Sequence, residues 1–360
     1  MRSAALRRNK SIFWSVLTTA LTITILISCA FAQNPSPATP APPTAGNGST
    51  TEQTPPSQST PPQAAPDDAQ PAAQEPTAND QGSMFVFKKQ VEEVVLHATV
   101  FDDQQHLVTG LDQAAFTVLE QGKAQKVTSF RREDVPVAIG IVVDNSGSMR
   151  DKREQVNNAV LNLIRASNPQ DEVFVVNFSQ NYYLDQDFTS NVNLLQTALH
   201  QVSSSGSTAL YDAIVASTMH LKNNPRLDKR VLLVITDGQD NMSQETLQEA
   251  AQRLQQANGP TLYAIGLLGS GLQSSGRDAL QRLASGTGGV AYFPDSLNQV
   301  DSITRTVAHD IRSQYMIAYR PSNQSAQPGY QPVVVEAHVP GYGKLTVRTR
   351  SGYYPPQPSH

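Results

Sequence analysis

The spacing of apolar residues divides the chain into regions with different periods. Between residues 134 and 314, near-continuous apolar runs such as VAIGIVVD, EVFVVNF, RVLLVITD and LYAIGLL alternate with amphipathic stretches. The first amphipathic stretch places Val156, Val160 and Leu163 at helical spacing. Apolar runs of this kind are typical of parallel strands that are covered on both faces. The pattern predicts an α/β domain over residues 134–314, with a doubly wound, Rossmann-like, mostly parallel sheet whose ligands bind beyond the carboxyl ends of the strands.

A second pattern, in which apolar and polar residues alternate, flanks this domain on both sides. In residues 84–133, Val94, Leu96 and Ala98 fall on one side of a strand, and AFTVLEQGKAQKVTSF predicts two short strands around a turn. Residues 315–360 show the same alternation in QYMIAYRP, PVVVEAHV and KLTVRTRSGYY. The first set ends too soon to close a sheet by itself. We therefore expect the two β segments to pair in one small β-sandwich, with the α/β domain inserted between them.

Residues 1–32 have the pattern of an export signal peptide. Basic residues lead into the apolar run IFWSVLTTALTITILIS, and Ala30-Phe31-Ala32 forms a small-residue cleavage site. The run is short for a membrane span of about 20 residues, which disfavours a cytoplasmic anchor. The four residues ending at Cys29 also resemble the lipobox of bacterial lipoproteins, so a lipid anchor at Cys29 and a cleaved secreted form are both open. In either case we expect an exported protein that is periplasmic, anchored to the outer membrane or extracellular.

Composition sets further limits on structure and partners. Residues 33–83 are rich in proline, alanine, glutamine and threonine, which predicts a disordered linker, either a spacer or an unselected connection. Cys29 is the only cysteine, so no disulfide can form within the chain. The net charge is −4 and becomes more negative when the basic residues of the signal are removed. Electrostatics therefore gives no reason to expect nucleic acid or anionic lipid as a partner.

The segment IVVDNSGSMR ends an apolar run with one carboxylate and two alternate hydroxyls, from Asp144, Ser146 and Ser148. A helix cap would explain only one of these side chains. A hydrolase nucleophile at a strand-to-helix turn requires G-x-S-x-G, but Asp144 and Ser148 stand where the glycines belong, and no histidine lies in a motif that would make it a base. We therefore expect no enzymatic activity. The remaining interpretation is a site for a hard metal ion.

Two later loops supply further oxygen ligands. SSSGSTALYDA places Thr208 at the start of a predicted helix, and RVLLVITDGQD places Asp237 directly after a predicted strand. Because the carboxyl ends of parallel strands meet at one edge of a sheet, the side chains from all three loops are expected to converge. The predicted metal ligands are Asp144, Ser146, Ser148, Thr208 and Asp237. All are hard oxygen donors, which suits Mg²⁺, Mn²⁺ or Ca²⁺ and disfavours zinc.

The succession of D-x-S-x-S, G-x-T and T-D-G resembles the von Willebrand factor type A domain, and the five residues match the metal-ion-dependent adhesion site of that family. The resemblance implies a protein-binding or adhesion module whose divalent cation, with Mg²⁺ favoured, captures an Asp or Glu carboxylate of a partner protein. It also implies that Ser146, Ser148 and Thr208 coordinate through hydroxyls, whereas Asp144 and Asp237 act through water or switch into direct coordination. The flanking segments resemble those of bacterial exported proteins related to this family.

The alternative function is a structural or scaffolding role in the cell envelope, in which the metal only stabilises the site loops. Several neighbours of the site also have two interpretations. Asp212 either bonds the Ser/Gly loop or is an ordinary helix residue, and Asp240 and Asn241 either face a partner or are solvated. Tyr182 and Tyr183 are expected to pack at a strand edge rather than to contact a partner.

Overall fold

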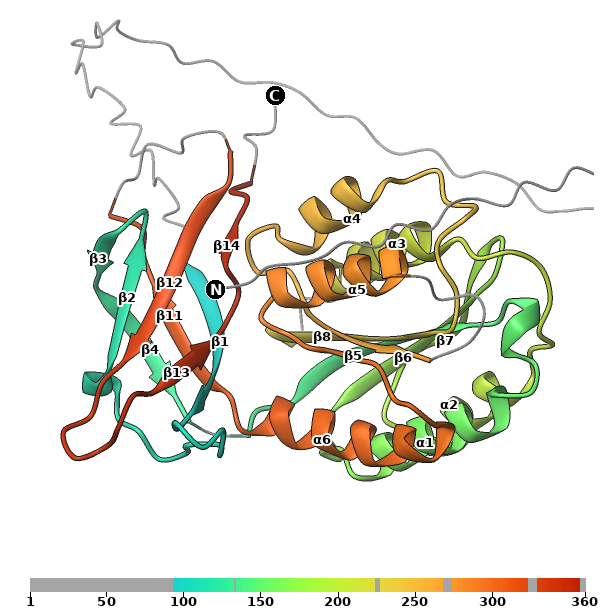
Figure 1. The fold of residues 1–360 in the computed structure, drawn as a ribbon, viewed down its shortest axis with the longest axis horizontal. Coiled ribbons are helices and arrows are strands. Elements are labelled where there is room, and N and C mark those ends of the chain that lie inside the picture. Colours follow the sequence, from blue (N-terminus) through green and yellow to red (C-terminus); the bar gives the residue numbers. More distant parts are fainter. Residues whose placement is uncertain (1–92, 133, 224–226, 268–273, 323–328, 357–360) are drawn as a thin grey trace, which may run out of the picture. The chain divides into compact units, whose positions relative to one another are not determined.

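The structure, a computed structural model, describes residues 93–132, 134–223, 227–267, 274–322 and 329–356 (Figure 1). The predicted signal peptide in residues 1–32 and the predicted linker in residues 33–83 lie outside the described residues. Within the described ranges, no helix has both the length and the apolar character needed to cross a membrane.

A six-stranded sheet forms the centre of the α/β region, in the order β10-β9-β8-β5-β6-β7. Its strands are β5 (Val137–Asp144), β6 (Glu172–Phe178), β7 (Tyr182–Thr189), β8 (Lys229–Thr236), β9 (Thr261–Gly266) and β10 (Ala291–Tyr292). Neighbouring strands pair in parallel except at the edge, where β7 is antiparallel to β6. Every residue of β5 and of β9 is buried, as expected for strands that are covered on both faces.

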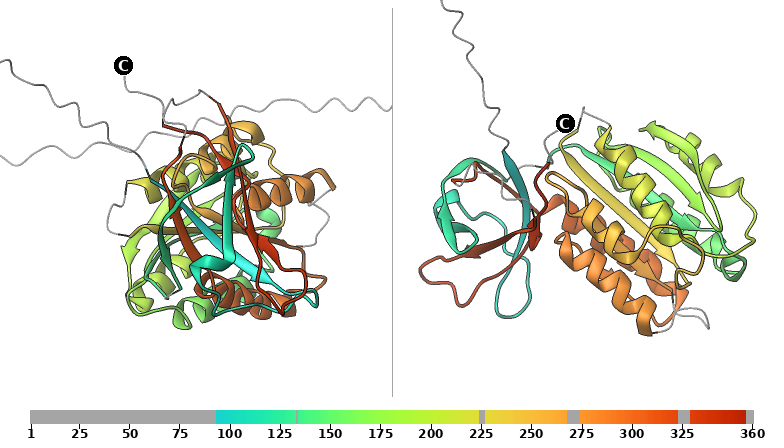
Figure 2. Two further views of the ribbon diagram at one scale, coloured as in Figure 1. Left: turned by 90° about the vertical axis from the view of Figure 1, so that its left-hand side faces the viewer. Right: turned by 90° about the horizontal axis from the view of Figure 1, so that it is seen from above.

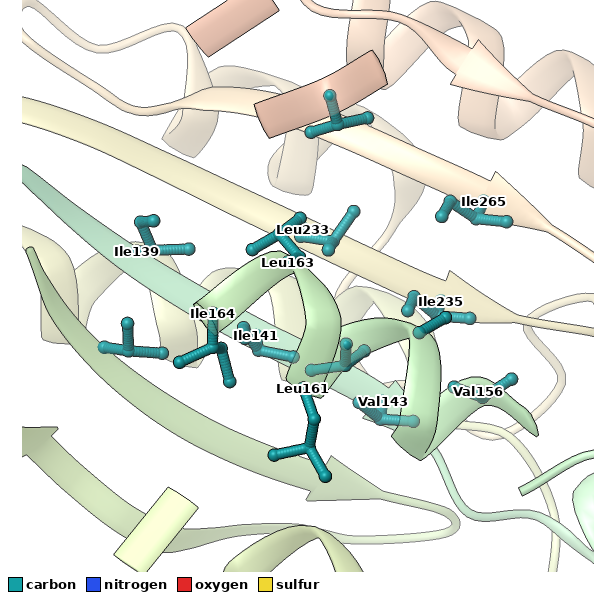
Figure 3. Packing of buried hydrophobic residues seen from close by; sticks show 14 of the residues in the cluster. Ile139, Ile141, Val143, Val156, Leu161, Leu163, Ile164, Leu233, Ile235 and Ile265 are labelled. Carbon is teal, nitrogen blue, oxygen red and sulfur yellow. The ribbon is translucent and has the colours of Figure 1, made fainter. Parts of the chain in front are cut away.

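Helices cover both faces of this sheet (Figures 1 and 2). They are α1 (Arg153–Arg165), α2 (Val192–His200), α3 (Leu210–Lys222), α4 (Leu247–Leu254), α5 (Ser274–Gly286) and α6 (Val300–Arg312). Side chains of α1, α2 and α6 pack on one face, and those of α3, α4 and α5 on the other. Figure 3 shows Val156 and Leu163 of α1 among Ile141, Val143 and Ile235 of the sheet. The residues at helical spacing are therefore the ones that face the core.

The edge strand β7 corrects one expectation from the sequence. Tyr182 and Tyr183, at its start, are 49% and 58% exposed. The expectation that they pack at a strand edge is therefore wrong for their side chains. The reason is that these two side chains point to opposite faces of the sheet and neither belongs to the buried clusters that the described helices form on those faces.

The flanking strands form two four-stranded antiparallel sheets, in the orders β13-β1-β11-β4 and β14-β12-β2-β3. The strands are β1 (Val94–Phe101), β2 (Phe116–Glu120), β3 (Lys123–Gln125), β4 (Val127–Arg131), β11 (Tyr315–Tyr319), β12 (Gln331–Ala337), β13 (Thr346–Arg348) and β14 (Gly352–Tyr353). Both sheets mix strands that precede and follow the α/β region, with Leu96 opposite Ile317 and Val118 opposite Val335. These four side chains lie in one buried core. The predicted fold class, a doubly wound α/β sheet with a small β-sandwich, is confirmed.

Asp310, near the end of α6, bonds to residues of both regions. Its carboxylate accepts hydrogen bonds from the Thr99 hydroxyl of β1 at 3.0 Å and from the Tyr263 hydroxyl of β9 at 2.6 Å. It also forms an ion pair with Arg348 of β13. Asp310 is 7% exposed, so this network is a buried polar connection between α6, the central sheet and the sandwich.

Candidate metal centre

The five predicted ligand residues lie at one edge of the central sheet. Asp144 is the last residue of β5, and Asp237 directly follows β8, the parallel neighbour of β5. Ser146 and Ser148 belong to the turn and the short helix η2 (Gly147–Met149) that lead into α1. Thr208 lies just before α3. The convergence expected from the order of strands and helices is therefore present in the structure.

A chain of polar contacts joins four of these residues, in the order Asp144, Ser146, Ser148 and Asp237. The Ser148 hydroxyl donates to Asp237 Oδ1 at 2.7 Å, and its oxygen lies 3.2 Å from the Ser146 hydroxyl oxygen. The backbone N–H of Ser146 donates to Asp144 Oδ1 at 2.8 Å. The D-x-S-x-S turn is thus bound both to the end of its own strand and to the loop after β8.

Gly238 lies close to both Thr208 and Asp144. A Cβ at Gly238 would lie 3.1 Å from Thr208 Oγ1 and 3.8 Å from Asp144 Oδ2. Both oxygens therefore lie within 4 Å of the same point, and any side chain at position 238 would crowd them. The glycine of the T-D-G motif keeps this part of the site open.

The candidate ligands differ in how they meet the surface. A surface hollow is lined by residues of three loops, namely Ser146, Gly147, Ser148, Gly206, Ser207, Thr208, Gly238, Gln239, Asp240 and Asn241. The hydroxyl-bearing residues Ser146, Ser148 and Thr208 are part of this lining. Asp144 and Asp237 are outside it and are 0% and 1% exposed. Three hydroxyl-bearing residues and Asp240 thus line the hollow, with Ser148 exposed and Ser146 and Thr208 only 3% and 4% exposed, while Asp144 and Asp237 lie outside the lining.

The burial of Asp144 has an electrostatic consequence. Loss of water raises the pKa of this carboxyl, and the nearby charge of Asp237 raises it further. Hydrogen bonds from the Thr236 hydroxyl at 2.5 Å and from the Ser146 N–H act in the opposite direction. A cation beside the two aspartates would favour their ionised forms, so the site provides electrostatic attraction for a positive ion.

Two basic residues at the start of α1 contact the site, and the sequence analysis did not identify them. Lys152 forms an ion pair with Asp237 Oδ2. Arg153 is 7% exposed and donates to Asn177 Oδ1 at 2.9 Å and to the Leu199 carbonyl at 3.0 Å. Burial lowers the pKa of Arg153 to about 10. The sequence did contain a signal for these contacts, namely a lysine and an arginine about one helical turn after Ser148. Side chains at this spacing reach back over the preceding turn.

The Thr208 loop is held by Asn241, another residue without an assigned role. Asn241 Oδ1 accepts from the Thr208 N–H at 2.9 Å, and the Asn241 N–H donates to the Thr208 carbonyl at 3.0 Å. Asn241 is exposed, in agreement with its interpretation as a solvated loop residue, and it also binds the backbone on both sides of the Thr208 side chain. Asp212 binds the N–H groups of Gln244 and Glu245 instead of the Ser/Gly loop, which corrects the first interpretation of that residue.

The donor set fits a hard divalent cation. Hydroxyl and carboxylate oxygens are the ligands that Mg²⁺, Mn²⁺ and Ca²⁺ prefer. The part of the chain that the structure describes holds no group of three or more His, Cys, Asp or Glu side chains suited to a metal. Any ion at this edge of the sheet would therefore depend on the hydroxyls of Ser146, Ser148 and Thr208 as well as on the two aspartates.

Comparisons with known proteins agree with this fold. Residues 139–239 match the family model of the von Willebrand factor type A domain. None of the curated proteins compared with the chain matches it.

Similar solved structures are distant in sequence. The conserved hypothetical protein BatB from Bacteroides thetaiotaomicron has 17% identity and a TM-score of 0.41, with 49% of this chain and 100% of that chain covered. A von Willebrand factor type A protein from Catenulispora acidiphila has 13% identity and a TM-score of 0.44, with 76% of each chain covered. The vWF domain of the type V pili tip protein Mfa5 from Porphyromonas gingivalis has 12% identity and a TM-score of 0.42, covering 49% of this chain and 97% of that chain. Similarities this distant carry no information about function.

The matched segment includes all five candidate ligands and the loops that present them. Domains of this family commonly bind a divalent cation and are generally interaction modules rather than enzymes. The resemblance drawn from the three motifs is confirmed, because the family match and the observed sheet both cover the segment that contains them. The chain carries a von Willebrand factor type A domain.

Proposed function

We propose that this protein is an exported binding module that captures an Asp or Glu carboxylate of a partner protein through a divalent cation, with Mg²⁺ favoured over Mn²⁺ and Ca²⁺. The observation that supports this proposal best is the division of the oxygen donors. Ser146, Ser148 and Thr208 line the surface hollow and Asp144 and Asp237 do not, and Ser148 is the exposed member of the five. The hollow is therefore accessible to a side chain of another protein.

The two kinds of donor have different chemical effects. The three hydroxyls offer neutral oxygens, which bind a hard cation without cancelling its charge. The two buried carboxylates balance the charge from the protein side and are themselves held by Ser148, Ser146 and Thr236. A divalent cation bound here would supply a positive charge with coordination positions open to the hollow. A carboxylate is the protein side chain best suited to bind such a charge.

The proposed location rests on the sequence. A signal peptide at residues 1–32 would direct export, and the chain would then be either released by cleavage or held by a lipid anchor at Cys29. The linker at residues 33–83 would act as a spacer between the folded part and a membrane. The proposed folded part consists of a β segment at 84–133, the type A domain at 134–314 and a second β segment at 315–360. We infer binding rather than catalysis, because the Ser146 and Ser148 hydroxyls contact each other and Asp237 rather than an imidazole.

A structural role is the second candidate, and direct bonds between the loops favour it. Ser148 binds Asp237, and Asn241 binds Thr208. These contacts already join the three loops, so an ion could serve only to strengthen them. In that case acetate, as a model of a partner carboxylate, would not change the binding of the ion.

Calorimetric titration of the full chain with Mg²⁺ and Mn²⁺, in the presence and absence of excess acetate, tests the proposal. We expect one site, with binding that tightens in acetate. Ser148→Ala is the informative variant because Ser148 is exposed and its loss should leave the fold intact. It should weaken ion binding by about tenfold or more. Ser302→Ala removes a hydroxyl of α6 that bonds only locally, to the Gln299 carbonyl, and should bind like the wild type.

The outcomes separate the candidates. Ion binding that is lost in Ser148→Ala and strengthened by acetate supports carboxylate capture. Ion binding that is indifferent to acetate supports the structural role. Absence of ion binding by the wild type in both conditions would remove the metal from the proposal.

A further inference from the structure

Lys152 places a positive charge on one of the two carboxylates proposed to serve the divalent cation. Its ammonium group forms an ion pair with Asp237 Oδ2. The Asp237 side chain is 1% exposed and that of Lys152 is 19% exposed, so water screens this contact weakly. By comparison, the side chains of the ion pair between Arg305 and Asp301 are 64% and 33% exposed. Ion pairs of that exposed kind contribute little to stability.

Lys152 differs from the other donors to the two aspartates. Asp237 accepts from the Ser148 hydroxyl through Oδ1 and from Lys152 through Oδ2. Asp144 accepts from the Ser146 N–H and from the Thr236 hydroxyl. Of these four donors only Lys152 carries a charge. Lys152 is therefore the group that offsets the negative charge of Asp237, where a divalent cation would do the same.

Lys152 has a fixed backbone and a flexible side chain, so the contact with Asp237 can form and can also be released. Its backbone forms the N-cap of α1, and its N–H donates to the Met149 carbonyl at 2.9 Å. The backbone is thus fixed one helical turn after the D-x-S-x-S motif. The side chain is a flexible four-carbon stem with a compact charge at its end. It can leave Asp237 by rotation without any change in the helix.

We propose that Lys152 is a built-in counter-ion that sets the affinity of the site for a divalent cation. The inference rests on the proposed function, because it takes Asp237 as a group that serves the cation. An arriving cation competes with the ammonium group for Asp237 and is repelled by it at short range. The protein alone therefore holds the ion loosely. A partner carboxylate adds the negative charge that favours the ion over the lysine, so ion and partner bind together more strongly than either does alone.

The test compares three full-length proteins by calorimetric titration with Mg²⁺ and with Mn²⁺. Lys152→Met keeps the length of the side chain and removes its charge. It should bind the ions about tenfold or more tightly than the wild type. Arg150→Met is the matched control, because Arg150 is an exposed cation in the same turn whose side chain bonds the Ser204 carbonyl. Its affinity should stay within about twofold of the wild type.

A second measurement, thermal unfolding after chelation of metals, tests the ion pair itself. Lys152→Met should lower the melting temperature by about 3 °C or more, because it leaves the buried Asp237 charge without its partner. In the Asp237→Asn background the same substitution should have little effect. An equal effect of Lys152→Met on the melting temperature in the wild type and in the Asp237→Asn background would overturn the assignment of Lys152 as counter-ion.

Unchanged or weaker ion binding by Lys152→Met would also overturn the inference, while leaving the proposed function in place if the wild type binds the ion. If neither protein binds an ion although the coupling is present, the proposed metal site fails, and with it the effect of Lys152 on affinity.

Discussion

The Thr236 hydroxyl donates a hydrogen bond of 2.5 Å to Asp144 Oδ2, joining the last residue of β8 to the last residue of β5. Both residues are fully buried. Thr236 therefore supplies a polar partner to a carboxylate that has lost its water. The same hydroxyl accepts from the Gly238 N–H at 3.1 Å, which ties it to the T-D-G loop.

Thr236→Val should destabilise the protein by about 1–3 kcal/mol, because it leaves a buried carboxylate with one donor fewer at nearly constant side-chain volume. Denaturant unfolding measures the loss. Thr218→Val is the control, since the Thr218 hydroxyl is also buried but bonds only a carbonyl of its own helix, that of Ile214 at 2.7 Å. A smaller loss in Thr236→Val than in Thr218→Val would contradict the role assigned to Thr236.

Gly238→Ala should impair ion binding far more than stability. The added methyl would lie 3.1 Å from Thr208 Oγ1 and 3.8 Å from Asp144 Oδ2, close to both candidate donors. We expect Mg²⁺ affinity, measured by calorimetry, to fall by about tenfold or more. Gly343→Ala, where the nearest atom is Asp103 Oδ2 at 3.5 Å, should bind like the wild type. Equal ion affinity in Gly238→Ala and the wild type would place the ion elsewhere.

The lowered pKa of Lys229 predicts that the free energy of unfolding rises at alkaline pH. Burial lowers its pKa from 10.5 to about 8, although Asp134 and Asp310 act in the opposite direction. Below pH 8 the lysine is protonated in both the folded and the unfolded chain, so the full cost of the buried charge is present. Between pH 8 and 10.5 the unfolded chain binds more protons than the folded one, and stability rises.

The Lys229 contribution is isolated by comparison with Lys229→Met. The free energy of unfolding of the wild type, relative to that of the variant, should increase by about 2 kcal/mol from pH 7 to pH 10. Urea unfolding at several pH values gives this difference. A difference that stays constant over this range would show that Lys229 titrates alike in the folded and unfolded chains.

Asp310→Asn should destabilise the fold by about 2–4 kcal/mol. The substitution removes the negative charge opposite Arg348. It also replaces one of the two carboxylate oxygens that accept from the Thr99 and Tyr263 hydroxyls by an amide NH₂ group, which cannot accept. Asp301→Asn on the same helix affects only exposed contacts, the ion pair with Arg305 and a hydrogen bond from Asn162, and should cost less than about 1 kcal/mol. Chemical unfolding of the two variants side by side provides the comparison, and equal losses would contradict a structural role for the Asp310 network.

The order of elements and the location of the candidate site were predictable because their signals are local. Buried parallel strands produce unbroken apolar runs, and the covering helices produce a stripe at helical spacing. The topology of such a sheet then brings the ends of β5 and β8 to one edge, so Asp144 and Asp237 could be assigned to the same site before any geometry was known. The grouping of the flanking strands followed from their number, since neither set could close a sheet alone.

The side-chain partners of the site depended on tertiary structure. Lys152 bonds Asp237 across 85 residues of sequence, and Asn241 bonds the Thr208 loop across 33 residues. The spacing of Lys152 after Ser148 indicates only that it can reach back over the turn, and neither it nor Asn241 identifies its partner, because the partners lie on segments that are distant in sequence. The same holds for Asp212, which bonds the loop after β8, and for Tyr182 and Tyr183, which lie outside the buried clusters on both faces of the sheet.

The sequence by itself determined the fold class and the family and supplied the proposed set of oxygen donors, since periodicity and motif order are properties of short segments. Only the tertiary structure decided which of these residues line the surface hollow and which internal cation bonds one of the carboxylates. The physical reason is that burial and electrostatic pairing arise where separate segments pack together.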